Sequence, residues 1–153
     1  MERINHQLEE KLTDFISKLE EDNELKKNYH FNSVINLTIG IIKHNNEEAN
    51  EMKSLLLKYF NKIQYEKLNK LESIVLFEKY ILPLSRFMIK TEKYGTKSNL
   101  LIYLSIGLIL DVLTWLSNII GPFLPLFLIT FCALGFYSRQ QKIKKGKFFA
   151  MNW

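Results

Sequence analysis

The chain has 153 residues, of which 47% are hydrophobic, and a formal net charge of +5. This length is sufficient for one domain with a small addition. Residues 1–97 carry 16 Lys/Arg against 15 Asp/Glu, whereas residues 139–153 carry five cations and no acid. This distribution argues against nucleic acid as a partner, because a nucleic-acid-binding domain would carry its cations on a folded face. The only cysteine, Cys132, excludes an intramolecular disulfide framework.

The first part of the chain has the apolar spacing of amphipathic helices. Apolar residues recur every three or four positions from Ile4 to Leu19, which predicts a helix with one buried face. The stretch EEDNE interrupts this pattern, and a second apolar helix is expected over 30–43. No alternation typical of a strand is present, so residues 1–97 predict an α-helical bundle.

A longer amphipathic pattern runs from residue 46 to residue 82. Asn46 is a suitable N-cap, because two acidic residues follow it in the first helical turn. The apolar stripe changes phase near Gln64 and Tyr65, so the pattern fits either two helices or one helix that changes its packing face. Pro83 is expected to kink or end the helix, and a further short helix leads to Gly95. Four apolar residues lie off the main stripes and are candidates for an exposed contact surface: Ile41, Leu57, Phe60 and Phe77.

Residues 98–138 form an apolar block of 41 residues in which Asp111 is the only charged side chain. A membrane-spanning helix needs about 20 apolar residues, so the block has room for two. Gly121, Pro122 and Pro125 divide it, which predicts one helix over 98–118 and a shorter one over 123–139. The alternative is the buried core hairpin of a soluble protein, but the remaining residues offer too little surface to cover it.

These patterns predict an all-α chain in three parts: a cytosolic helical domain over 1–97, a two-helix transmembrane hairpin over 98–139 and a basic, aromatic cytosolic tail over 140–153. Cations flank the hairpin on both sides and the connecting loop has no charge, so both termini are expected in the cytoplasm and the hairpin in the inner (plasma) membrane. The tail is expected to lie along the inner leaflet and to bind anionic lipid, unless it is a plain stop-transfer segment. Its cations are Arg139, Lys142, Lys144, Lys145 and Lys147.

Asp111 is unusual because a charged residue at the centre of a membrane helix costs about 2.5–3.5 kcal/mol. At helical spacing it lies on a polar and small-residue stripe, which we interpret as an oligomerisation surface or the lining of a lumen. The stripe comprises Tyr103, Gly107, Asp111, Thr114 and Asn118. The second helix offers only the hydroxyls of Thr130 and Ser138, which do not neutralise a carboxylate. We therefore expect the partner of Asp111 outside the chain: a second copy, another protein, a proton or water in a lumen.

No catalytic, cofactor-binding or metal-binding signature is found, so no enzyme and no cofactor are expected. The six glycines do not form a phosphate-binding loop, the H-E-x-x-H and C-x-x-C patterns are missing, and the three histidines stand apart. The composition, rich in Lys, Asn and Ile, is typical of an AT-rich genome, and we expect a bacterial one.

Two functions remain. The first is a non-enzymatic, self-associating inner-membrane protein, in its sharper form a small pore or channel-like effector assembled through the Asp111 stripe. The alternative is a membrane anchor or accessory subunit that recruits a larger complex through its helical domain. The expected partners are membrane lipid, further copies of the chain and a protein that binds residues 1–97.

Overall fold

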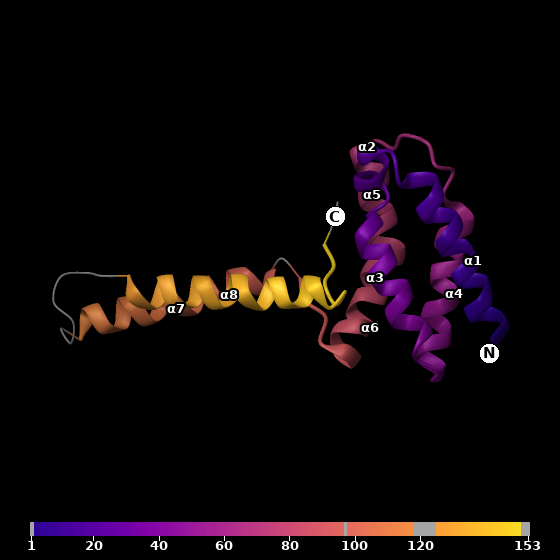
Figure 1. Ribbon diagram of the computed structural model, residues 1–153. Helices are drawn as coiled ribbons and strands as arrows, with labels where there is room; N and C mark the ends of the chain where they lie inside the picture. The colour runs from indigo at the N-terminus through magenta and orange to yellow at the C-terminus, as the bar shows by residue number, and fades with distance from the viewer. Residues whose placement is uncertain (1, 97, 118–124, 151–153) are drawn as a thin grey trace. The chain divides into compact units, whose positions relative to one another are not determined.

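The computed structural model describes residues 2–96, 98–117 and 125–150, and over these residues the chain is all-α, as the sequence predicts. The chain divides into two compact units. The first unit contains residues 1–94 together with the segment that starts at Phe149, and the second contains residues 95–148. Figure 1 shows the helices of both units.

The first unit is built from seven consecutive helical segments among its described residues. They are α1 (Glu2–Leu19), α2 (Asn23–Asn28), α3 (Phe31–Ile42), α4 (Glu47–Lys62), α5 (Lys70–Leu76), the π-helical segment η1 (Phe77–Ile81) and α6 (Leu82–Glu92). Side chains cap three of them: Asp22 accepts hydrogen bonds from two amides of α2, Asn46 from one amide of α4, and Asn69 forms a capping box with Glu72 in α5. The expected cap at Asn46 is therefore confirmed.

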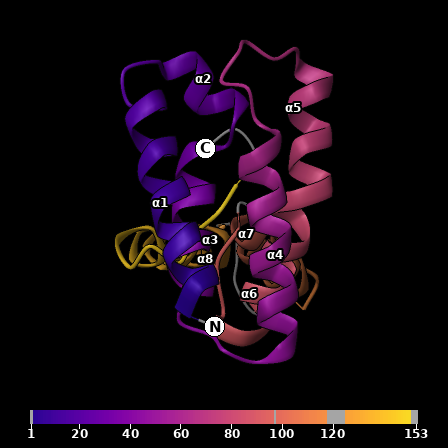
Figure 2. The same cartoon turned by 90° about the vertical axis from the view of Figure 1, so that its right-hand side faces the viewer.

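The core of the first unit forms where α1, α3 and α4 contact one another, an arrangement visible in Figures 1 and 2. The predicted α1 stripe is buried from Leu8 to Leu19. Phe15 is its centre, with ring centroids 5.5 Å from Phe60 and 6.2 Å from Tyr59. The expectation that Ile41 and Phe60 are exposed is wrong, because both are buried, and Leu57 and Phe77 are partly buried against the core. A helix that contacts several neighbours in a bundle has more than one of its faces buried.

The amphipathic pattern from 46 to 82 forms two helices, because the chain turns at Tyr65, whose φ is 57°. The second of them does not end at Pro83: α5, η1 and α6 follow one another without a break. Proline lacks the amide that would bond the carbonyl one turn earlier. The turn before it widens instead, and the N–H of Leu82 bonds the oxygen of Phe77, five residues back.

The second unit is a hairpin of two antiparallel helices, α7 (Ser98–Leu116) and α8 (Leu126–Lys144), which lie side by side in Figure 1. Among the described helices, α7 alone is long and apolar enough to cross a membrane, over Asn99–Leu116. The last turns of α8, from Arg139 onward, are polar, which leaves it a shorter apolar part.

A buried polar cluster fastens α5 to the start of α3. His30 is fully buried, and its Nε2 lies 2.9 Å from the oxygen of Ser73. The Ser73 hydroxyl donates to the oxygen of Asn28 at 2.7 Å, and the ring of Phe77 packs edge-on against the imidazole. Burial lowers the pKa of His30, and the hydrogen bond to Ser73 opposes this shift only in part.

The lowered pKa of His30 predicts that acid destabilises the first unit. The unfolded chain binds this proton more readily than the folded chain, so the free energy of unfolding falls as the pH drops below about 6.5, by at most about 1.4 kcal/mol per pH unit. Urea unfolding of the full chain in detergent, at pH 7.5 and 5.5, measures the loss. We expect His30→Asn to reduce it, since Asn tolerates the left-handed backbone of this residue. His6→Gln, at a mostly exposed ring, is the control that should retain it. An equal pH dependence in wild type and His30→Asn would contradict the prediction.

Candidate functional site

Asp111 is buried inside the hairpin, with 2% of its surface exposed. Its Oδ1 accepts a hydrogen bond from the amide of Phe127 at 3.0 Å, and its Oδ2 accepts one from the amide of Leu128 at 2.8 Å. Both donors belong to the first turn of α8. The carboxylate of one helix thus caps the other.

The start of α8 explains why such a cap is needed. The N-cap residue is Pro125, which has no side chain that can bond the first amides. The first intrahelical bond of α8 runs from Ile129 to the oxygen of Pro125, which leaves the amides before Ile129 without a partner in their own helix. Asp111 accepts at the second and third helical positions, the two amides that an ordinary N-cap side chain would bond. The positive end of the α8 dipole also favours a negative group at this place.

Two glycines allow the helices to come close enough for these bonds. A Cβ on Gly107, one turn before Asp111, would lie 2.8 Å from the Cα of Leu128 and 3.0 Å from the oxygen of Phe127. A Cβ on Gly135, further along α8, would meet side-chain atoms of Leu100 and Tyr103. Small residues permit this close approach of two helix backbones.

Three of the five residues of the polar stripe predicted on α7 lie against α8 of the same hairpin. Tyr103, Gly107 and Asp111 all contact or bond α8. The Thr114 hydroxyl donates within its own helix, to the oxygens of Leu110 and Asp111. Asn118 lies outside the described residues. The expectation that Asp111 must find its partner outside the chain is wrong, because backbone amides supply it. The signal for this partner in the sequence is Pro125 at the start of an apolar helix, because a proline N-cap leaves the first amides without a side-chain acceptor.

The predicted basic tail is divided between a helix and the segment after it. Arg139, Lys142 and Lys144 lie on the last turns of α8. The Arg139 guanidinium lies 5.5 Å from the ring centroid of Phe148. The amide of Gly95 donates a hydrogen bond to the backbone oxygen of Lys147 at 2.8 Å. Lys145 is exposed beyond the helix. Contact of these cations with lipid stays a prediction.

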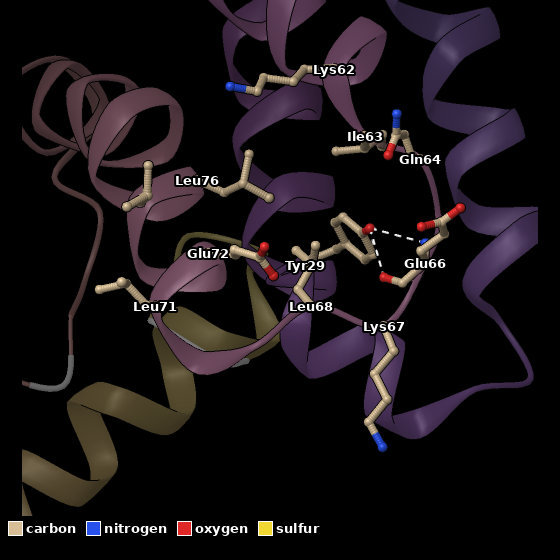
Figure 3. A pocket seen from close by; sticks show the side chains of 11 residues that line it. Tyr29, Lys62, Ile63, Gln64, Glu66, Lys67, Leu68, Leu71, Glu72 and Leu76 are labelled. Carbon is tan, nitrogen blue, oxygen red and sulfur yellow. Dashed lines mark hydrogen bonds between the residues drawn. The ribbon is translucent and has the colours of Figure 1, made fainter.

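The first unit contains a cavity of about 460 Å³ beside α5 (Figure 3). The Tyr29 hydroxyl in its wall donates to the oxygen of Glu66 at 2.8 Å and accepts from the amide of Glu66 at 3.1 Å. Lys67 is ion-paired with Glu24 at 2.9 Å, and Glu72 is engaged in its capping box. Leu71, 70% exposed, and the exposed Val75 also line the cavity. The polar groups of Tyr29, Lys67 and Glu72 are thus bonded within the protein, whereas the apolar side chains of Leu71 and Val75 are open to solvent.

The described residues contain no group of three or more His, Cys, Asp or Glu placed to hold a metal ion. No protein-family model matches the sequence, and searches of curated proteins and of solved structures find no match.

The cap predicts that Asp111→Leu loosens the first turn of α8. Loss of an N-cap costs about 0.5–2 kcal/mol, which corresponds to an increase of about 2- to 30-fold in amide exchange at Phe127 and Leu128. Hydrogen exchange of the full chain in detergent, resolved by NMR, measures this rate. Asp111→Asn, with one side-chain oxygen, should give an intermediate rate. Thr114→Val is the matched control, because its hydroxyl bonds only its own helix. Unchanged exchange in Asp111→Leu would show that the carboxylate does not cap α8.

Proposed function

We propose that this chain is a non-enzymatic membrane anchor: the α7–α8 hairpin is embedded in lipid and the helical unit is held at the cytoplasmic surface, where it recruits a protein partner. The observation that carries the proposal is the apolar outer surface of the hairpin. Its exposed large hydrophobic side chains occur along both helices: Leu101, Ile102, Ile106, Leu108, Ile109, Val112, Leu113, Trp115, Leu116, Leu126, Ile129, Leu134, Phe136 and Tyr137.

The polar groups of the hairpin support a lipid environment. Its one acid is turned inward onto α8, and the exposed hydroxyls of Ser105 and Thr130 donate to carbonyls of their own helices, at Leu101 and Leu126. A soluble monomer rarely exposes so large a continuous apolar surface. The core-hairpin alternative is disfavoured because most of α7 is uncovered by protein.

The dimensions of α8 support a specific role for the cap in the membrane. Its apolar part, residues 126–138, is about 20 Å long at 1.5 Å per residue, which is less than the hydrocarbon thickness of about 30 Å. With Arg139 at the polar boundary, α8 begins inside the apolar layer, where no water can bond its first amides. Asp111 supplies the acceptors at that depth.

This geometry favours the anchor over the self-associating pore. The pore interpretation arose from a carboxylate without an internal partner, and Asp111 has two. Tyr103, Gly107 and Asp111, which would line a lumen, lie against α8 within the hairpin, and the outward surface left for other copies is largely apolar. The basic flanks support the inner membrane and cytoplasmic termini. In the first unit, the open apolar side chains of Leu71 and Val75 beside the cavity offer a surface for the protein partner.

Membrane integration is tested by flotation of the full chain synthesised with vesicles of phosphatidylethanolamine and phosphatidylglycerol. We expect the wild type to float and to remain bound after an alkaline carbonate wash. Ile109→Lys places a cation on the outer face of the hairpin, at about 2.5–3.5 kcal/mol, and should reduce the bound fraction. Leu71→Lys makes the same change at an exposed site of the first unit and should leave binding unchanged. A wild-type chain that stays in the supernatant would contradict the proposal.

The stoichiometry separates the anchor from the pore. Native mass spectrometry from nanodiscs should give the same number of chains per particle for wild type and Asp111→Leu, because the carboxylate acts within one hairpin. A homo-oligomer that dissociates in Asp111→Leu would favour assembly through the stripe instead, and conductance would then be measured.

A further inference from the structure

The segment that follows the hairpin is part of the first unit. Phe149 is 5% exposed and belongs to the core of that unit, and Ala150 is buried beside it. The hydroxyl of the fully buried Ser33, on α3, donates to the oxygen of Ala150 at 2.7 Å and accepts from the amide of Ala150 at 3.0 Å. One serine thus satisfies both backbone groups of the returning residue.

The chain also leaves the first unit at α3. Tyr94, the last residue before the second unit, is buried, and its hydroxyl donates to the oxygen of Asn36 at 3.0 Å. Asn36 lies three residues after Ser33 on the same helix. Exit and return are therefore both fastened to α3, with the whole hairpin between them in the chain.

We propose that α3 carries a docking slot for the segment Phe149–Ala150, and that filling this slot completes the helical unit only when the hairpin returns the chain to the side of the membrane it left. The slot is a property of the first unit alone; the topological consequence rests on the membrane anchor proposed above. A chain that crossed once would place Phe149 on the far side and leave the core of the helical unit short of one aromatic side chain. The stability of the helical unit thereby reports correct insertion.

The slot is tested first in detergent, where no membrane topology is involved. Phe149→Asp should lower the thermal midpoint of the first unit by at least about 5 °C, because it removes a buried aromatic ring and adds a charge. Ser33→Ala should lower it by less, through the loss of its two hydrogen bonds. Ile39→Asp, at an exposed position on the same helix, is the control with no large change. A chain ending at residue 148 should be destabilised like Phe149→Asp and be restored by an added peptide of residues 144–153, but not by that peptide with Phe149→Asp. A full midpoint in the truncated chain would overturn the slot.

The topology is tested in sealed vesicles with a doubly substituted chain. Lys58→Cys on the first unit and Lys145→Cys after α8 are both at exposed positions, and Cys132→Ser removes the native thiol. Intact-mass analysis after treatment with a membrane-impermeant maleimide should show molecules modified twice or not at all. Singly modified molecules would overturn the proposal that both cysteines lie on the same side of the membrane. If the wild type fails to float but Phe149→Asp lowers the thermal midpoint, the anchor alone is rejected. If the wild type floats but Phe149→Asp leaves the thermal midpoint unchanged, the slot alone is rejected.

Discussion

The hairpin depends on one constraint at the start of α8. The first amides of a helix need acceptors from outside its own hydrogen-bond ladder, and the N-cap residue Pro125 has no side chain that can supply one. Asp111 meets this constraint from the opposite helix, with one oxygen for Phe127 and the other for Leu128. Charge-assisted bonds of this kind are stronger than neutral ones, and the α8 dipole adds a favourable potential. Both effects offset part of the desolvation cost of the buried carboxylate. The bonds need a short distance between backbones, which Gly107 provides. Asp111, Gly107 and Pro125 therefore act together. Pro125 leaves the first amides of α8 uncapped, Asp111 bonds them, and Gly107 lets the two helices come close enough for these bonds.

The same arrangement changes how function is inferred from the polar stripe. An acid in an apolar helix favours a functional site when its partner is missing, because an unsatisfied charge in lipid is retained only for a reason. Once both oxygens are bonded inside the hairpin, that reason is structural. The membrane anchor proposed above then depends on the outward surface of the hairpin, which is apolar along α7 and the first part of α8. A surface of this kind suits lipid, and a polar, water-filled path would need side chains that the described hairpin turns inward.

Features set by local spacing could be predicted from the sequence, and features set by backbone groups or by distant segments could not. The α1 stripe, the Asn46 cap and the break near Tyr65 follow from periodicity and turn chemistry, and the structure contains all three. The short helix α2 was missed because its signal, an Asp22 cap inside an acidic stretch, is that of a loop. The cap on α8 was missed because its donors are amides, which every residue carries. Phe149 belongs to the tail for which the sequence predicts contact with lipid, because aromatic residues beside lysines are typical of a membrane surface. Only the fold shows that its ring lies in the core of the first unit.

Helix α3 bonds both Tyr94, before the hairpin, and Ala150, after it, although its sequence is inconspicuous. Its residues are mostly apolar, and its polar members Ser33 and Asn36 look like minor interruptions of a buried helix. Each holds one end of the inserted hairpin, Asn36 through its carbonyl and Ser33 through its hydroxyl. Gly40, one turn further, leaves room for the ring of Tyr94, because a side chain there would meet its hydroxyl. A helix that served only the core could carry larger apolar residues at Ser33 and Gly40, whereas the bond at Asn36 uses a backbone oxygen that any residue would supply. The serine and the glycine are accounted for by the two segments that α3 receives, Ala150 at the Ser33 hydroxyl and the ring of Tyr94 beside Gly40.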